Sequence, residues 1–243
     1  MKTIKKGSFS LRNVNLWMIS TLLLGGIVVG YTAGGLTPTP WTSGASVVEA
    51  TPSEAPQRQI QIQPVTEEDN VRGSTNPIIT LVEYSDFECP YCKSFHETMK
   101  SIIADYGDSV QWVYRDLPID SIHSKARTEA EAAECAGKQG KFWEMADAIF
   151  AVTPSNDGLD LALLPELARE IGVDMDEYSQ CVEERQTQQR VEDNIRDAAQ
   201  AGATGTPFNV VMAEGELIPA AGALSKAQLV QFIEGVLSRA EAQ

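Results

Sequence analysis

A pair of cysteines stands at the point where the hydrophobic pattern of this chain changes its period. The β-branched run Ile78–Tyr84 predicts a short buried strand, and the residues that follow Cys89–Cys92 (C-P-Y-C) carry apolar side chains at helical spacing. The run Val110–Tyr114 predicts a second strand. Strand, helix and strand in this order form a βαβ unit, whose two strands lie parallel. The cysteine pair therefore falls between a buried strand and the first turn of a helix.

The remainder of the chain extends this unit into a larger α/β domain. Helical patterns fill the region from about 120 to 201, and residues 175–200 are predicted to form one long polar-faced helix. Residues 208–212 and 217–223 predict a β-hairpin, and a final helix starts at a capping box formed by Ser225 and Gln228. The order βαβ, helices, ββα predicts an α/β domain that carries an inserted helical subdomain.

The N-terminal segment is predicted to export this domain. Residues 1–15 contain basic side chains and no acid, and residues 16–36 contain no charge. As a helix, residues 16–36 would span about 31 Å, which matches a bilayer core of about 30 Å. We expect an uncleaved transmembrane signal-anchor helix, with the tail 1–15 in the cytoplasm and the catalytic domain outside the cell membrane, in the periplasm. A cleavable signal peptide is the alternative, although its apolar region is usually shorter, at about 7–15 residues.

Composition separates a linker from the folded domain. Residues 37–65 are rich in Pro, Thr, Ser, Glu and Gln, which predicts a flexible linker ahead of a domain over 66–243. The formal net charge is −15. Such an acidic chain would repel phosphates, so non-specific binding to nucleic acid is excluded. The charge otherwise favours solubility.

Three kinds of chemistry are open to the Cys89–Cys92 pair. A structural zinc site needs about four ligands, but the chain has no second C-x-x-C and its only histidines are His96 and His123. A structural disulfide would close a very small loop and gain little chain entropy. Redox exchange fits best, because Cys89 would cap the helix N-terminus, where the amides and the dipole stabilise a thiolate. We therefore expect Cys89 to be the attacking thiol and Cys92 the buried resolving thiol, with no metal and no cofactor.

The segment V-E-Y-S-D-F-E-C-P-Y-C, together with A-T-G-T-P far downstream, resembles the DsbA-like thiol–disulfide oxidoreductases of the thioredoxin superfamily. The segment from Arg115 to Phe150 is similar to the helical insertion of that family, and the likeness covers residues 66–240. The resemblance implies a thioredoxin fold and a protein thiol–disulfide oxidoreductase. One departure is the Pro-Tyr dipeptide in place of the Pro-His of the strongest oxidases, which leaves the direction of electron flow open.

The resemblance also implies roles for particular residues. Thr206-Pro207 is similar to the cis-proline loop of the family, which would bind a peptide together with Pro90 and Tyr91. Glu83 matches a buried acid that assists proton transfer, and a strand glutamate that faces solvent is the alternative.

Three further residues near the pair receive structural expectations. His123 resembles a histidine of the family that we expect to lead into a helix rather than to catalyse. Asp86 and Glu88 could tune the redox potential of the pair, but we expect them to be solvated loop charges.

The remaining cysteines, Cys135 and Cys181, lie on predicted helices of the insertion. An exported protein with an even number of cysteines tends to pair them. If Cys89 and Cys92 form one pair, Cys135 and Cys181 form the other, a structural disulfide between two helices. Two buried free thiols are the alternative.

The predicted function is that of a membrane-tethered enzyme that introduces disulfides into reduced or unfolded exported proteins. A membrane partner linked to quinones, similar to DsbB, would reoxidise it. One alternative is a reductase or isomerase kept reduced by a membrane electron donor, and another is a thioredoxin-fold binding module without catalysis. We expect a monomer, because the linker is too short and polar to form a dimerisation domain.

Overall fold

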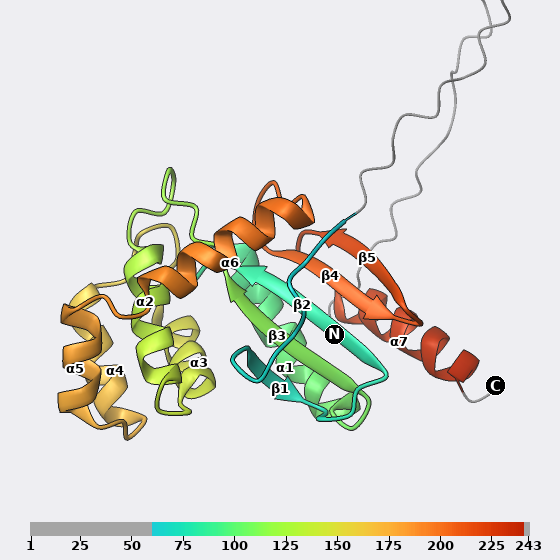
Figure 1. Ribbon diagram of the computed structural model, residues 1–243, viewed down its shortest axis with the longest axis horizontal. Coiled ribbons are helices and arrows are strands. Elements are labelled where there is room, and N and C mark those ends of the chain that lie inside the picture. The colour runs from blue at the N-terminus through green and yellow to red at the C-terminus, as the bar shows by residue number, and fades with distance from the viewer. Residues whose placement is uncertain (1–59, 241–243) are drawn as a thin grey trace, which may run out of the picture. The chain divides into compact units, whose positions relative to one another are not determined.

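The computed structural model describes residues 60–240, which form a sheet with helices on both faces and a group of helices at one end (Figure 1). The predicted tail 1–15, the predicted membrane helix 16–36 and the linker before residue 60 lie outside the described residues. Among the helices between residues 60 and 240, none is both long enough and apolar enough to cross a membrane.

The sheet has five strands in the order β1-β3-β2-β4-β5. β2 pairs with β3 in parallel, as the βαβ pattern predicts, and every other pair is antiparallel. β1 was not predicted, because four residues are too few to show a hydrophobic period. The strands are β1 (Asn70–Gly73), β2 (Ile79–Ser85), β3 (Val110–Asp116), β4 (Phe208–Ala213) and β5 (Glu216–Ala221).

Helices cover the sheet on both faces, so all seven residues of β2 are buried. α1 (Pro90–Tyr106) and α7 (Lys226–Ala240) cover the face to which Ile79 and Leu81 contribute. α6 (Gln188–Ala201) and the segment after residue 60 cover the face to which Val82 and Tyr84 contribute. Because side chains alternate along a strand, Glu83 and Ser85 lie on the α1 face, beneath the start of that helix.

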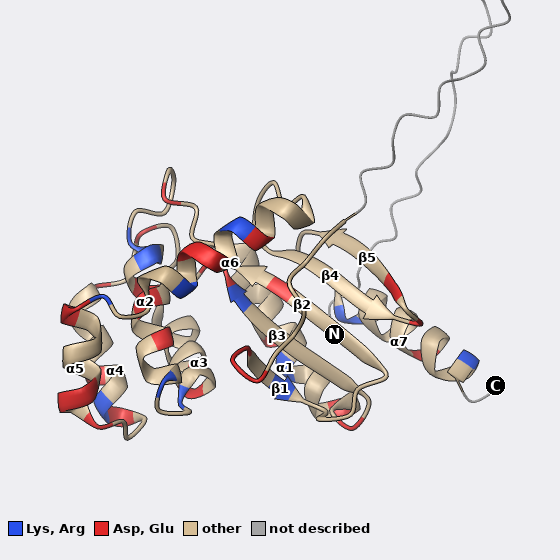
Figure 2. Cartoon of the chain, in the orientation of Figure 1, with Lys and Arg blue, Asp and Glu red and all other residues tan. Residues whose placement is uncertain are grey.

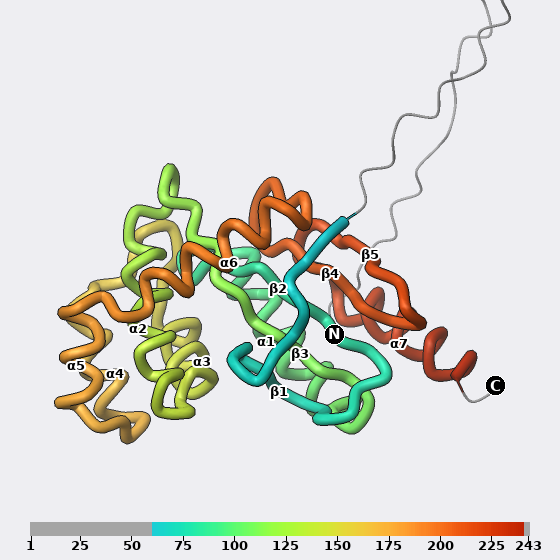
Figure 3. Tube along the Cα trace, in the orientation of Figure 1, coloured from blue at the N-terminus to red at the C-terminus, as the bar shows by residue number. Residues whose placement is uncertain are grey.

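The predicted α/β fold with inserted helices is confirmed. Figure 3 traces the chain as it leaves β3, builds the helical group and returns along α6 to β4. The apolar core of this group extends to Cys89, Cys92 and Tyr114 of the sheet domain. Acidic side chains lie on α5 and α6 (Figure 2). Its elements before α6 are α2 (Ala126–Gly137), α3 (Phe142–Val152), the 3-10 turn Leu161–Leu163, α4 (Leu164–Glu170) and α5 (Met175–Glu183).

The prediction of one long helix over 175–200 was wrong, because the chain breaks between α5 and α6. Arg185 adopts a left-handed backbone with φ of 50°, and the Gln186 amide donates to the Cys181 carbonyl at 3.0 Å, which closes the end of α5. The Arg185 guanidinium also donates to both carboxylate oxygens of Glu131 on α2. No glycine or proline marks the break, so the sequence carried no signal for it.

The structure joins Cys135 on α2 to Cys181 on α5 through a disulfide. The two Cα atoms are 5.8 Å apart, inside the range that a bridge requires, and the sulfurs are 2.04 Å apart. The break after α5 directs Cys181 toward α2, since an unbroken helix would carry α5 in line with α6. The bridge therefore fastens α5 to α2 within the helical group.

Candidate functional site

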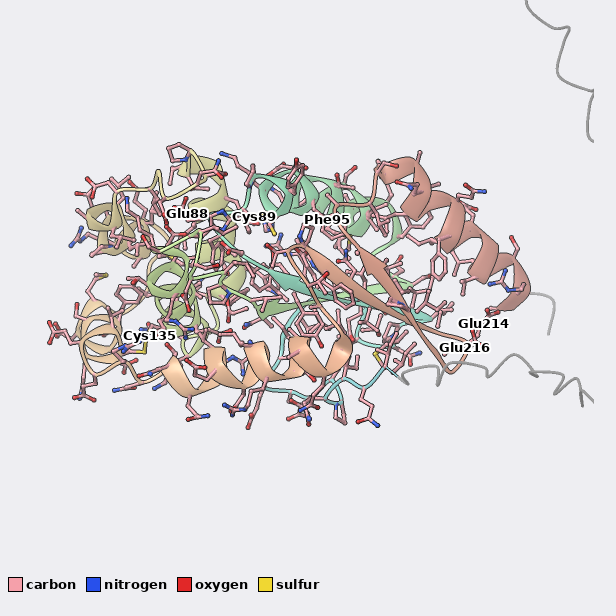
Figure 4. The ribbon with its side chains drawn as sticks, turned by 90° about the horizontal axis from the view of Figure 1, so that it is seen from above. Glu88, Cys89, Phe95, Cys135, Glu214 and Glu216 are labelled. Carbon is pink, nitrogen blue, oxygen red and sulfur yellow. A yellow bond between two sulfur atoms is a disulfide. The ribbon has the colours of Figure 1, made fainter. Side chains whose placement is uncertain are left out.

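Cys89 and Cys92 lie where β2 gives way to α1, and both are free thiols in the structure. Cys89 is the N-cap residue of α1, with extended backbone angles, and Pro90 is the first residue of the helix. Proline suits that position because the amide it lacks would have no partner within the helix. Cys92, one turn later, is fully buried, while Cys89 keeps 5% of its surface exposed. Figure 4 shows Cys89 at the start of the helix.

The environments of the two thiols separate their acidities. A hydrogen bond from the Cys92 thiol, supported by the backbone amides of Cys92 and Tyr91, lowers the pKa of Cys89 to about 6 despite its partial burial. Burial raises the pKa of Cys92 well above its usual range, and the hydrogen bond to Cys89 and the charges of Cys89 and Glu83 raise it further. At neutral pH the Cys89 thiol is therefore largely a thiolate and Cys92 keeps its proton.

The Thr206-Pro207 loop lies directly against the pair. The peptide bond between these residues is cis, and the Cys89 thiol donates to the Thr206 carbonyl at a sulfur–oxygen distance of 3.4 Å. Pro207 is buried and its carbonyl accepts from the Gly222 amide at 2.8 Å, so the loop is anchored to the residue that follows β5. The sequence thus brings together two segments more than a hundred residues apart, with Cys89 facing the loop backbone.

Glu83 is fully buried on the α1 side of β2, so the alternative of a solvent-facing strand glutamate was wrong. Its Oε2 accepts from the Trp112 indole N–H at 2.9 Å, and its Oε1 has no hydrogen-bond partner within residues 60–240. Burial raises the pKa of Glu83 to about 7, against the lowering effect of Ser85 and Trp112. An acid of this pKa beside Cys92 can hold or release a proton at neutral pH; that role remains a prediction.

The expectation that Asp86 and Glu88 are solvated loop charges was wrong, because both are buried. Asp86 accepts from the amides of Glu88 and Ile119, each at 2.8 Å, and lies 2.9 Å from Nδ1 of His123. Burial raises the pKa of Asp86. The segment just before Cys89 is thus held by groups from the long connection after β3, which sequence patterns do not reveal.

His123 precedes α2, as predicted, and also contacts the site. Its carbonyl accepts from the Ala126 amide at 3.2 Å at the start of the helix. Burial lowers the pKa of His123, but the hydrogen bond to Asp86 and the charges of Asp86 and Cys89 outweigh it, so the pKa is raised. A cationic imidazole near Cys89 favours the thiolate.

Exposed apolar side chains gather around the pair. Five large hydrophobic residues are exposed within residues 60–240, and three of them, Tyr91, Ile122 and Val152, belong to segments that meet at the site. Tyr91 is 68% exposed and lies between the two cysteines. Ile122 precedes His123, and Val152 precedes Thr153, whose carbonyl accepts from Lys93 of α1 at 2.6 Å.

Neither histidine is placed to complete a metal site with the cysteines. His96 is fully buried on α1, with Nε2 2.6 Å from Asp147, and no group of three or more His, Cys, Asp or Glu between residues 60 and 240 is arranged to hold a metal ion.

Comparisons with known proteins agree with this geometry. A sequence profile described as Thioredoxin matches residues 65–235. The chain is similar to the crystal structure of Pseudomonas aeruginosa DsbA2, at 27% identity and a TM-score of 0.58, over 72% of this chain and 96% of that one. A thioredoxin-like oxidoreductase from Silicibacter pomeroyi DSS-3 is 26% identical with a TM-score of 0.59, over 73% and 95% of the two chains. BdbD from Bacillus subtilis shares the fold at 22% identity and a TM-score of 0.61, over 74% and 98%.

Curated sequences include much longer proteins. The chain is 37% identical to the Na(+)/H(+) antiporter NhaA 3 of Salinispora tropica over 139 residues. The matched segment covers 57% of this chain and 21% of the antiporter. An NhaA 1 antiporter of Salinispora arenicola is 35% identical over the same length, with the same coverage. The chain spans about a fifth of the length of the curated relatives it matches. By its profile match, its fold and its paired thiols, the chain belongs to the thioredoxin family and is a DsbA-like thiol–disulfide oxidoreductase.

Proposed function

We propose that this protein is an exported, membrane-tethered oxidase that introduces disulfides into reduced or unfolded proteins. The observation that carries the proposal is the contrast between Cys89, whose pKa is lowered to about 6, and the buried Cys92, whose pKa is raised. A stabilised thiolate stabilises the reduced form of the enzyme, and an enzyme with a stable reduced form gives up its disulfide readily. Burial fixes which sulfur is attacked, because Cys92 is fully buried whereas Cys89 keeps part of its surface exposed.

The reaction begins with the Cys89–Cys92 disulfide. A substrate thiolate attacks Sγ of Cys89, which forms a mixed disulfide and releases Cys92 as a thiolate that takes up a proton. Glu83 is placed to supply that proton, since its pKa of about 7 keeps part of it protonated at neutral pH. A second substrate thiolate then attacks the substrate sulfur of the mixed disulfide, and Cys89 leaves as a thiolate. Two electrons have moved from the substrate to the enzyme pair.

The surroundings of the pair support a protein substrate. Tyr91, Ile122 and Val152 offer apolar surface to an unfolded segment, and the cis Thr206-Pro207 loop offers backbone groups to an extended peptide. Exposed apolar side chains grouped in this way are typical of binding sites.

Export and the tether are supported by two separate features. The charge-free segment 16–36 follows a basic tail, and the Cys135–Cys181 bridge is a structural disulfide, which persists in oxidising compartments. The two electrons gained in each cycle require an acceptor, and we propose a membrane partner linked to quinones, similar to DsbB. The enzyme acts as a monomer.

The second candidate is a reductase or isomerase supplied with electrons at the membrane. Tyr91 favours it, because the position between the cysteines holds no histidine to stabilise the Cys89 thiolate further. A binding module without catalysis is disfavoured, because binding alone does not require a stabilised thiolate at a helix N-terminus.

Equilibration with glutathione buffers decides between the first two functions. A reduction potential of about −120 mV indicates an oxidase. A value of about −270 mV indicates a reductase and overturns the proposal. A Cys92→Ala variant expressed with the full N-terminal segment should also accumulate exported proteins as mixed disulfides on non-reducing gels. An absence of such adducts would contradict exchange through Cys89.

A further inference from the structure

The loop that follows α3, residues 153–159, has an unusual backbone. Ser155, Asn156 and Asp157 all adopt left-handed conformations, with φ values of 66°, 53° and 62°. Left-handed backbone costs free energy for residues that carry a Cβ atom, and a run of three is maintained only where the surroundings fix it. Pro154, Asn156 and Gly158 are exposed, while Thr153, Ser155 and Leu159 are buried. The loop thus presents alternate residues to solvent.

Glu88, the residue before the nucleophile, holds this loop with its backbone and its side chain. The Glu88 carbonyl accepts from the Asn156 amide at 2.8 Å. Its carboxylate accepts from the Gly158 amide at 3.1 Å and the Leu159 amide at 3.3 Å. A buried carboxylate that accepts from backbone amides is a strong anchor, because hydrogen bonds to a charged acceptor are the stronger kind.

Three further side chains secure the arrangement. Lys93 of α1 donates to the Thr153 carbonyl at 2.6 Å, and Lys125 donates through Nζ to the Leu159 carbonyl at 2.6 Å. Glu129 of α2 lies near Glu88, and burial together with the charge of Glu88 raises the pKa of Glu129 to about 9. At neutral pH Glu129 is therefore protonated, so it adds no negative charge beside the Glu88 carboxylate.

The loop lies on the side of Cys89 that faces the helical group, whereas the cis-proline loop contributes the Thr206 carbonyl to the same sulfur. Figure 4 shows Glu88 next to Cys89, toward the helices of the insertion. The two loops thus contact Cys89 and its neighbour Glu88 through backbone groups. Asn156 is the exposed residue of this loop whose backbone amide bonds directly to the Glu88 carbonyl.

We propose that the 153–159 loop is the second wall of the substrate-binding site, with Asn156 as a residue that selects the substrate side chain beside the reacting cysteine. Glu88 is the positioning residue that holds Asn156 at this wall. The proposal rests on the proposed exchange with peptide thiols and adds to it the element that distinguishes one peptide from another.

The test uses two reduced dithiol peptides that differ only in a Lys or Glu next to the cysteine. Asn156→Asp adds a charge without bulk, and aspartate tolerates left-handed backbone as asparagine does. We expect the ratio of kcat/KM for the Lys peptide to that for the Glu peptide to rise roughly two- to fivefold, the range that exposed ion pairs supply. Asn76→Asp is the matched control, an exposed site before β2, at the opposite end of that strand from Cys89.

Glu88→Gln in the Asn156→Asp background tests the positioning role. Gly158 and Leu159 donate to different oxygens of Glu88, so Glu88→Gln would place an NH2 donor against one of the two amides. The loop should lose that anchor, and the peptide ratio should return toward the wild-type value. The rate with a small dithiol monitors the thiols themselves. If the Glu88→Gln form fails to fold, Asn156→Asp alone still decides whether the loop meets the substrate.

The outcomes distinguish the proposed wall from the proposed protein substrates. Exchange with both peptides but the same ratio in Asn156→Asp and Asn76→Asp would overturn the wall and leave the oxidoreductase function intact. No exchange with either peptide in the unaltered full-length protein, despite reaction with a small dithiol, would overturn the proposed protein substrates and the wall together.

Discussion

The two cysteine pairs of this protein are similarly buried but have different roles: Cys89 and Cys92 are the reactive pair, and Cys135 and Cys181 form a structural bridge. Cys135 and Cys181 are 1% and 3% exposed, and Cys89 is only slightly more accessible at 5%. Accessibility therefore does not distinguish the reactive thiol from the structural ones. Cys89 differs because the amides at a helix start surround its sulfur, whereas Cys135 and Cys181 face each other between two helices. The reactivity of Cys89 depends on the groups that stabilise its thiolate. The contribution of the Cys135–Cys181 bridge to the stability of the fold depends on the length of chain that it closes.

The largest effect should come from removing the sulfur of the reactive pair. Cys89→Ser should reduce disulfide exchange with peptides to the uncatalysed rate, because the variant cannot form the Cys89–Cys92 disulfide and its remaining Cys92 thiol is buried. Cys135→Ala/Cys181→Ala should keep the exchange rate of the wild type at a temperature where it remains folded. Turnover of a reduced peptide measures both. Exchange that persists in Cys89→Ser would end the assignment of the nucleophile.

Alkylation compares the two thiols within the reactive pair. At pH 6 the reduced Cys89 should react several hundred times faster than Cys92, since about half of it is thiolate while a thiol of pKa 9 or above is ionised to less than about one part in a thousand. The Cys89 rate should fall about fivefold from pH 6 to pH 5 and approach a tenfold fall for each further pH unit. Mass spectrometry of samples labelled with iodoacetamide for different times gives the alkylation rates of both residues. Equal labelling of the two residues would contradict the roles.

The structural bridge should have its effect on stability. It closes a loop with a sequence separation of 46 residues, so its loss in Cys135→Ala/Cys181→Ala should lower the free energy of unfolding by roughly 3–4 kcal/mol in the chain-entropy model. Urea denaturation of the two proteins, with Cys89 and Cys92 reduced in both, measures the difference. A loss below about 1 kcal/mol would show that the helices of the insertion hold together without the bridge.

The smallest effect concerns Glu83, which sharpens the contrast between Cys89 and Cys92. Its folded pKa of about 7 lies above the ordinary value of 4.5, so ionisation of Glu83 makes the fold less stable as pH rises from 4.5 to 7. Glu83→Gln should remove that loss and be the more stable protein at pH 8, with a smaller difference at pH 4. It should also slow release of Cys92 by about a hundredfold, the low end of general acid catalysis.

Two measurements check the Glu83 prediction separately. Thermal unfolding at pH 4 and pH 8 reports its charge, and stopped-flow kinetics of a peptide thiol with the oxidised protein reports proton delivery. A variant whose stability changes with pH as the wild type does would contradict the buried charge. Unaltered exchange kinetics would instead show that Cys92 obtains its proton elsewhere.

Much of the fold and of the reactive pair could be predicted from sequence because local patterns encode them. The change from strand to helical period located Cys89 at a helix start, and the cysteine count and resemblance pointed to the other features of the site. What escaped prediction depends on partners distant in the chain. Asp86 and Glu88 look like loop charges until Ile119, His123, Gly158 and Leu159 bury them and donate to them.

Two further features, β1 and the break between α5 and α6, also escaped prediction. β1 contains four residues, which is too short for a period-two pattern to emerge. The break between α5 and α6 occurs at Arg185, a residue that ordinarily favours helix. Its left-handed backbone is stabilised by the pairing of its guanidinium with Glu131, 54 residues away in the chain. Neither feature can be read from neighbouring residues.

The hydrogen bond from Trp112 to Glu83 gives the site an optical reporter. The indole is buried, and its N–H lies 2.9 Å from a carboxyl group that titrates near neutral pH. The emission of an indole responds to charge at its nitrogen, so the fluorescence of Trp112 should follow the ionisation of Glu83. Trp143 lies 4.5 Å from Trp112 between ring centroids, so a variant that keeps Trp112 as its only tryptophan is needed to observe the protonation state beneath the cysteines during turnover.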